Sequence, residues 1–274
     1  MTQDMTTGSP MRLIIMFTIP LLIGNVFQQL YSMADTVIVG RTIGVQALAA
    51  VGATGPLCFL VLGFFFGFSS GVTVVTAQRF GAKDSDGVRR SIAMATMLCA
   101  AISAVATIGS VILTKPLLRL MNTPEDIFGG SYEYLVVIFI GIGATVFYNL
   151  ISGIIRALGD SRTPLIFLIV ASVLNIVLDF IFILWFGMGV GGAAWATVIS
   201  QLASGLWCLQ FARRRYSQFQ LKRRDWHFSW NFAWEHLRIA LPMAFQFSIT
   251  AVGVIVMQAV LNTFGSTAVA AFTA

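Results

Sequence analysis

The segment between Arg12 and Arg41 limits most strongly what this chain can fold into. The two arginines enclose 28 residues, and most of these are apolar. At ~1.5 Å of rise per residue, a helix of this length crosses a hydrocarbon core of ~30 Å. The segment is too long for the core of a cleaved signal peptide, so we expect it to be retained as a first transmembrane helix.

The rest of the chain has the composition of a membrane protein. Hydrophobic residues make up 57% of it and charged residues only 10%, whereas about 25% of an ordinary soluble domain is charged. Short connections that hold nearly all the charge separate seven apolar segments, at residues 13–40, 47–78, 91–114, 132–155, 164–188, 190–212 and 236–264. The sequence therefore predicts an all-α membrane protein, with a six-helix transmembrane bundle followed by a seventh helix.

The basic residues predict the orientation of these spans. If the N-terminus is cytoplasmic, 14 of the 17 Lys and Arg residues fall on the cytoplasmic side. Cytoplasmic loops carry such an excess in multi-pass proteins. We therefore expect a multi-pass protein of the plasma (inner) membrane with a cytoplasmic N-terminus.

Polar side chains of four spans are expected at a similar depth, in the outer half of the membrane. Asp35 lies about 9 Å below the outer end of the first span. Asp179 lies in the outer third of the fifth span, with Asn175 one turn below it. Thr197 of the sixth span and Tyr134 of the fourth reach a similar level. Since an acid within a membrane span costs roughly 2.5 to 3.5 kcal/mol, we expect these oxygen groups to hold a proton or a hard monovalent cation.

An acid at this depth has few structural uses, but the other residues also have an ordinary structural explanation. Asn175 and Thr197 are residue types that form hydrogen bonds between membrane helices, and Tyr134 suits the aromatic belt at a membrane surface. Pro20, within the first span, is either a hinge at which the helix bends or a proline that its neighbours tolerate.

An internal repeat links the first and seventh spans. Ile19 and Pro20 align with Leu241 and Pro242 at an offset of 222, and small residues after Gly44 recur after Gly265. The seventh helix therefore starts a parallel second repeat, which a chain of this length leaves truncated. We expect a cytoplasmic tail (1–12), a six-helix N-lobe (13–212), a basic and aromatic cytoplasmic linker (213–235) and the first helix of an incomplete second lobe (236–274).

Several motifs in this order resemble the N-terminal lobe of the multidrug and toxic compound extrusion (MATE) family. They are PLLIGNVFQQLYSMADTVIVGR in the first span, the RALGDSRTP loop, NIVLD in the fifth span and GGAAWATVISQ in the sixth. The resemblance implies an antiporter that exports amphipathic or cationic small molecules in exchange for Na+ or H+, without a cofactor and with a second lobe. It also implies a cation site at Asp35, Asn175, Asp179, Thr197 and, less directly, Tyr134, with Pro20 as the bend in the first helix.

Other classes fit the sequence less well. A flippase for lipid-linked oligosaccharides shares the two-lobe architecture, but we would expect Arg or Lys inside its spans. An enzyme such as a membrane prenyl transferase needs clustered Asp residues for magnesium, which the sequence lacks. A cation channel needs rings of charge from several subunits. The basic linker with interleaved aromatics imitates a nucleic-acid patch, but contact with the lipid bilayer explains it more simply.

Overall fold

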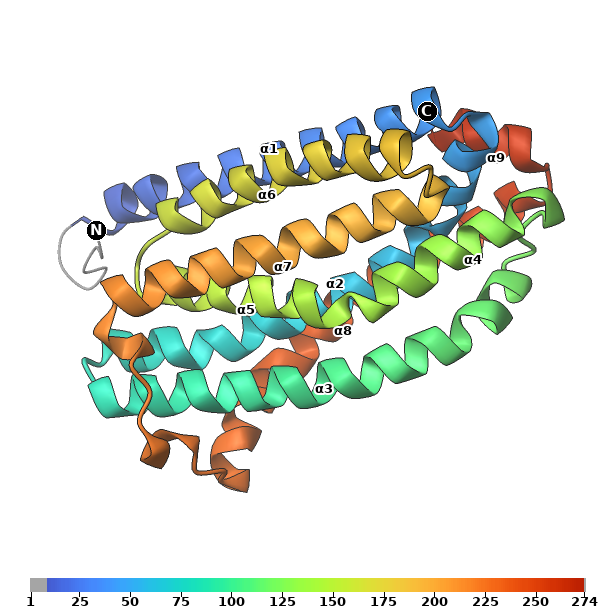
Figure 1. Ribbon diagram of the computed structural model, residues 1–274. Coiled ribbons are helices and arrows are strands. Elements are labelled where there is room, and N and C mark those ends of the chain that lie inside the picture. The colour runs from blue at the N-terminus through green and yellow to red at the C-terminus, as the bar shows by residue number, and fades with distance from the viewer. Residues whose placement is uncertain (1–8, 274) are drawn as a thin grey trace.

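The structure is a computed structural model that describes residues 9–273. Over this range it consists of helices and their connections, without a strand. The long helices lie along a common direction and form one elongated bundle (Figure 1). The helices are α1 (Pro10–Thr42), α2 (Val45–Gly81), α3 (Ser85–Leu120), α4 (Glu125–Ile140), α5 (Ile142–Ala157), α6 (Arg162–Phe180), α7 (Gly189–Arg215), α8 (Trp230–Asn262) and α9 (Ser266–Thr273).

Several of these helices are long and apolar enough to cross a membrane. Within the described chain, α1, α2, α3, α8 and α6 with its continuation to Trp185 meet this condition. The pair α4 and α5, bent by 47° at Gly141, makes a sixth span if it is counted as one. The chain is therefore a multi-pass membrane protein.

The seven spans expected from the sequence exceed this number. The difference is α7, which lies along α5 and α6 but is not apolar enough to count as a span by composition. Its 27 residues include many small and polar side chains and end in three arginines. The division into six helices plus one thus stays a prediction.

The predicted boundaries shift at several places. Helix α1 begins at Pro10, within the expected 1–12 tail, and proline suits a first helical turn. Residues 1–8 lie outside the described chain. The single segment 132–155 is two helices that meet at Gly141. The linker 213–235 shrinks to 216–229, since polar residues extend α7 and α8 beyond their apolar parts. Segment 236–274 holds the rest of α8 and also α9, while Ala274 is not among the described residues.

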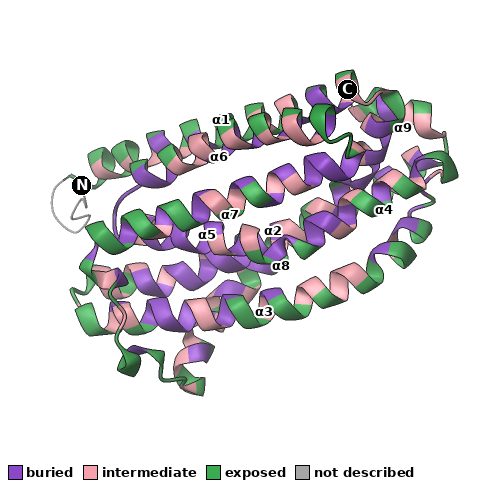
Figure 2. Cartoon of the chain, viewed as in Figure 1, coloured by how far each residue is buried: buried purple, intermediate pink, exposed green. Residues whose placement is uncertain are grey.

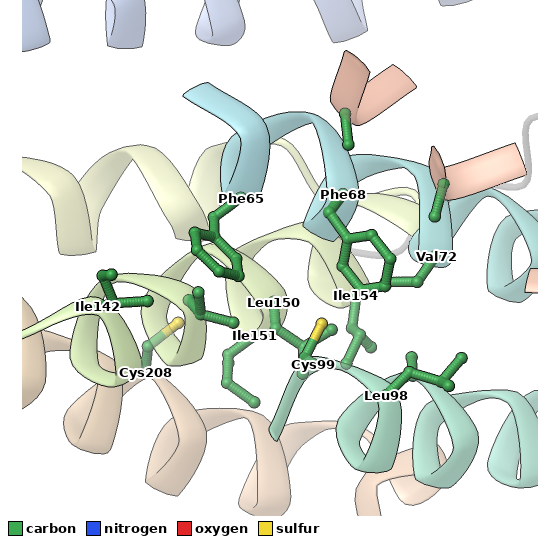
Figure 3. Close-up of a cluster of buried hydrophobic side chains, with 14 of the residues drawn as sticks. Phe65, Phe68, Val72, Leu98, Cys99, Ile142, Leu150, Ile151, Ile154 and Cys208 are labelled. Carbon is green, nitrogen blue, oxygen red and sulfur yellow. The ribbon is translucent and has the colours of Figure 1, made fainter. Parts of the chain in front are cut away.

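The core of the bundle is built around α2. Its Phe65 and Phe68 are buried among Ile154 of α5, Leu98 of α3 and Cys208 of α7 (Figure 3). The opposite side of α2 packs along α8. There the backbones approach so closely that a side chain in place of Gly67 or Gly71 would collide with the backbone of α8.

Helix α1 contrasts with α2 in its exposure. It packs mainly on α6, and most of its residues remain exposed or half-buried (Figure 2). Both α1 and α8 are 33 residues long and contain one proline, Pro20 and Pro242. Each is followed by a glycine with positive φ, Gly44 (116°) and Gly265 (90°), before the next helix begins. The repeat found in the sequence therefore has a counterpart in the local structure.

One end of the bundle, called the basic end below, carries most of the basic residues. It contains the start of α1, the α2–α3 and α5–α6 connections and the linker 216–229, and it lies at the left of Figure 1. A buried chain of hydrogen bonds ties three helices together there. The hydroxyl groups of Thr76 (α2) and Ser91 (α3) are 2.8 Å apart, and Ser91 Oγ lies 2.8 Å from Nε2 of His236 in α8. The ring of His236 also bonds through Nδ1 to the carbonyl of Phe232 at 2.8 Å.

A second polar contact at the basic end joins the α5–α6 loop to the linker. The Tyr216 hydroxyl donates to Oδ2 of Asp160 at 2.6 Å. Thr163 donates its N–H to Oδ1 at 3.0 Å and its hydroxyl to Oδ2 at 2.7 Å, and Arg162 N–H donates to Oδ1 at 2.9 Å. Burial alone would raise the pKa of Asp160, but these hydrogen bonds outweigh it and hold that pKa below its ordinary value. Burial and the neighbouring Asp160 raise the pKa of Tyr216.

The first prediction concerns Ser91. Replacing it in Ser91→Ala leaves a buried hydroxyl of Thr76 and a buried ring nitrogen of His236 without their partner. We expect a loss of about 1 to 3 kcal/mol of stability, seen as a lower unfolding temperature in detergent micelles. Ser110→Ala, in the same helix, is the matched control, because this hydroxyl donates no hydrogen bond within the described chain. Equal shifts for both variants would contradict the prediction.

The second prediction concerns the bond between Tyr216 and Asp160. Tyr216→Phe removes a hydrogen bond to a carboxylate, so we expect a loss of about 1.5 to 3 kcal/mol at pH 7. Because the pKa of Asp160 is lowered by folding, its contribution is present above the unfolded value of about 3.9 and is lost as pH falls through the folded value. Thermal unfolding at several pH values should therefore show the variant and the wild type converging below about pH 4. A difference that persists there unchanged would show that the phenol contributes through packing alone.

Candidate functional site

Two carboxyl groups meet where α1 lies beside α6. Asp35 stands near the end of α1 and Asp179 near the end of α6, and both side chains are buried. The two carboxyl groups lie close to each other. One oxygen of each, Oδ1, is buried without a hydrogen-bond partner in the described chain. Two carboxylates that lie this close repel each other when both are ionised.

Asn175 and Thr197 extend this pair into a network. In the amide orientation that satisfies all its neighbours, Asn175 donates to Oδ2 of Asp179 at 3.0 Å. Its oxygen then accepts the N–H of Thr197 at 3.1 Å and the hydroxyl of Thr197 at 3.2 Å. Asn175 lies one turn before Asp179 on the same face of α6, while Thr197 reaches across from α7.

Tyr31 belongs to the same network, although the sequence analysis did not single it out. Its hydroxyl donates to Thr197 Oγ1 at 3.3 Å. A continuous path of hydrogen bonds thus runs from Tyr31 through Thr197 and Asn175 to Asp179. The signal that could have found Tyr31 is its spacing, because it lies one turn before Asp35 on α1. A tyrosine in a membrane span is also easily taken for part of the aromatic belt.

The other two predicted residues lie outside this network. Tyr134 of α4 is half-buried against an apolar cluster that includes Val39 and Ile183, and it makes no hydrogen bond within the described chain. Pro20 is buried in α1, which continues through it as a helix. It lies 15 residues before Asp35, or about 22 Å along the helix axis.

The connection from α6 to α7 positions Asp179 and Thr197. After Asp179 the helix widens into a π-helical segment, Ile181–Trp185, a feature that is frequent at functional sites. The chain then reverses through Gly187 and Gly189, whose φ angles of 63° and 59° favour glycine. This tight turn brings α7 back along α6, so that Thr197 faces Asn175.

A cavity of about 320 Å³ adjoins the network at Tyr31. It lies between α1, α2, α5, α6, α7 and α8, and aromatic side chains such as Phe66 and Tyr148 form much of its wall. Amide and hydroxyl groups supply its polar part, and none of the lining residues is charged. Gln201, in this wall, has a buried Oε1 without a partner in the part of the chain that the structure describes. The cavity therefore offers apolar contact and neutral hydrogen-bonding groups.

The chemistry of the network limits what it could bind. Its donors are carboxylate, amide and hydroxyl oxygens, which suit a proton or a hard cation. Among the described residues, no group of three or more His, Cys, Asp or Glu side chains is arranged as a metal site. The network therefore fits a monovalent cation better than a transition metal.

Comparisons with known proteins show the family to which the chain belongs. The model of the MatE family matches residues 20–181. The probable multidrug resistance protein YpnP of Bacillus subtilis is 31% identical over 98% of this chain and 60% of its own length. The probable multidrug resistance protein NorM of Thermotoga maritima is 30% identical over 94% of this chain and 56% of its own length.

A solved structure supports the same relationship. It shows the outward-facing conformation of a multidrug resistance MATE family transporter of the MOP superfamily. Its TM-score is 0.86 at 29% identity, covering 97% of this chain and 59% of that chain. This chain thus spans about 60% of the length of the relatives that it matches. From the matched family model and the fold, the chain belongs to the MatE family of transporters, as its sequence motifs had indicated.

Proposed function

We propose that this chain is the first bundle of a secondary active efflux transporter that exports amphipathic or cationic small molecules in exchange for Na+ or H+. One observation carries the proposal. The acid pair of Asp35 and Asp179 is connected by hydrogen bonds, through Asn175 and Thr197, to Tyr31 in the wall of a neutral cavity. An ion site and a substrate site joined in this way are what an antiporter requires.

The ion is proposed to bind at the acid pair. Two adjacent carboxylates in a poorly hydrated place repel each other, so at least one favours a proton or a bound cation. Asp35, Asp179, Asn175 and Thr197 supply the oxygens for Na+ if sodium is the coupling ion, and the carboxyl groups alone suffice for H+. Tyr134 stands close enough to respond to the charge of the pair without binding the ion directly.

The substrate is proposed to bind in the cavity beside Tyr31. Its aromatic walls suit an amphipathic molecule, and its amide and hydroxyl groups can form hydrogen bonds with a substrate. Aromatic faces also attract cations. The absence of Lys and Arg from this lining argues against the alternative of a flippase for lipid-linked oligosaccharides, whose pyrophosphate calls for basic groups.

The conformational step is proposed to involve α1. When the acid pair is neutralised, the hydrogen bond from Tyr31 to Thr197 that joins α1 to α7 rearranges. Bending of α1 at Pro20 would then narrow the cavity and expel the substrate. A second bundle, formed by the lobe that α8 begins, would close the other side of the cavity. In this arrangement the basic end and the N-terminus face the cytoplasm, and the protein resides in the plasma (inner) membrane.

The third prediction tests the acid pair. In cells that express the chain joined to the second bundle of a MATE relative, we expect Asp35→Asn and Asp179→Asn each to reduce ethidium efflux by about tenfold or more, since a tenfold change needs only ~1.4 kcal/mol. Efflux is measured with sodium and pH varied independently. The coupling ion is the one on whose concentration efflux depends in the wild type but not in the site variants. Asp126→Asn, an exposed acid in the first turn of α4, is the control. Unchanged efflux in both site variants would overturn the proposed ion site.

The fourth prediction tests the connection between the two sites. Tyr31→Phe keeps the ring in the cavity wall but removes the hydrogen bond to Thr197. We expect the affinity for substrate to change little, while the factor by which the ion alters that affinity falls about fivefold, as the loss of one hydrogen bond of ~1 kcal/mol predicts. Titrations of ethidium fluorescence with and without the coupling ion measure this factor, and Tyr132→Phe, a tyrosine of α4 outside the site, is the control. Full coupling in Tyr31→Phe would show that the ion acts by another route.

A further inference from the structure

We propose that the basic end of α7 and the adjoining linker form a binding site for an anionic phospholipid. The site comprises a helix face with leucines followed by arginines, and a groove beside it that ends at a tryptophan. It does not depend on the transported substrate or on the coupling ion.

The linker is held firmly against the bundle. Tyr216 and Phe219 are both buried in the main hydrophobic core. Asp225 is also buried, and its Oδ2 accepts the N–H of Lys222 at 2.7 Å and lies 3.7 Å from Nε of Arg89 in α3. In Figure 1 the linker crosses from the end of α7 to the start of α8 at the basic end. Its exposed residues are therefore displayed in a fixed arrangement.

The charge on this surface is unbalanced. The acids near it are already engaged. Asp225 is within 4 Å of Arg89 and Arg224, Asp86 pairs with the same two arginines, and Glu235 accepts two hydrogen bonds from Arg79 at 3.0 and 3.1 Å. Five exposed basic residues have no ion pair within the described chain: Arg213, Arg214, Arg215, Lys222 and Arg223. Anionic groups from outside the chain are the natural partners for this cluster.

The shape of the surface fits a lipid with an acyl chain and a phosphate. A concavity on α7 is lined by Leu206, Leu209, Gln210, Arg213 and Arg214. These residues recur every three or four positions, so they lie on one face of the helix, with apolar side chains toward its middle and arginines at its end. An acyl chain along the two leucines would bring a phosphate to the arginines, whose guanidinium groups bind phosphate oxygens in pairs.

A second groove continues from the same arginine. Arg213, Gln220 and Trp226 line it, with a volume of about 330 Å³. Trp226 and the aromatic residues that follow it along the chain, Phe228, Trp230 and Trp234, are each 44% to 64% exposed. Tryptophan is enriched at the level of lipid headgroups, and each basic residue adds about 1 kcal/mol of attraction to an anionic membrane. A nucleic acid would meet the arginines but not the leucines that continue the site into the apolar surface.

The test measures lipid binding to the full chain in detergent micelles. Native mass spectrometry would compare phosphatidylglycerol with phosphatidylcholine of the same acyl chains. We expect the wild type to retain phosphatidylglycerol at least about tenfold more strongly, and Arg213→Gln with Arg214→Gln to weaken it about 30-fold, as two basic contacts predict. Lys115→Gln with Arg119→Gln removes the same charge from α3 away from the site and should leave binding unchanged.

Two further measurements distinguish a lipid phosphate from a soluble phosphate and control for misfolding of the variants. Glycerol 1-phosphate should fail to displace the lipid, and Leu206→Ser should weaken phosphatidylglycerol while leaving unfolding temperature unchanged. Displacement by glycerol phosphate, or by an oligonucleotide of equal charge, would assign the site to a soluble anion and overturn the proposal. If the double arginine variant does not fold, the comparison of the two lipids on the wild type decides: equal retention refutes an anionic lipid site.

Discussion

The burial of two carboxyl groups side by side is the constraint on which the rest of the site depends. Asp35 and Asp179 lie in helices that cross a membrane, where a single acid already costs roughly 2.5 to 3.5 kcal/mol. Part of this cost is offset by polar neighbours that form a hydrogen-bonded path to Asp179: Asn175, Thr197 and Tyr31. One oxygen of each acid has no hydrogen-bond partner in the described chain, and these are the oxygens available to the proposed proton or cation.

This network gives the proposed coupling a physical route. Affinities at two linked sites change reciprocally. If an ion at the acid pair changes the affinity of the cavity for substrate by some factor, the substrate must change the affinity of the acid pair for the ion by the same factor. Tyr31 belongs to both, since its hydroxyl contacts Thr197 and its side chain lines the cavity. The cavity itself is neutral, so its response to the ion depends on hydrogen bonds and helix position, not on charge in its own wall.

The sequence predicted helices and their approximate ends because hydrophobic length and charge placement act locally along the chain. Depth arguments also selected Asp35, Asn175, Asp179 and Thr197, which the structure brings together, since depth follows from residue number once a helix is assumed. The features that the sequence did not predict depend on three-dimensional packing. The bend at Gly141, the π-helical turn after Asp179 and the role of Tyr31 arise from contacts between helices. The sequence also counted α7 among the spans, but the many small and polar residues of this helix keep it below the apolarity of a span, so that this assignment stays a prediction.

The two proline-containing helices of the repeat are not equivalent in this bundle. Helix α8 is fixed to α2 by backbone contacts at Gly67 and Gly71 and to α3 by the bond between Ser91 and His236. Helix α1 rests mainly on α6, and only 6% of its most apolar window is buried in the described chain. Bending α8 would therefore break buried polar and close-packed contacts, whereas bending α1 disturbs few. Of the two, α1 is the helix whose shape an ion at Asp35 could change at a small cost in free energy.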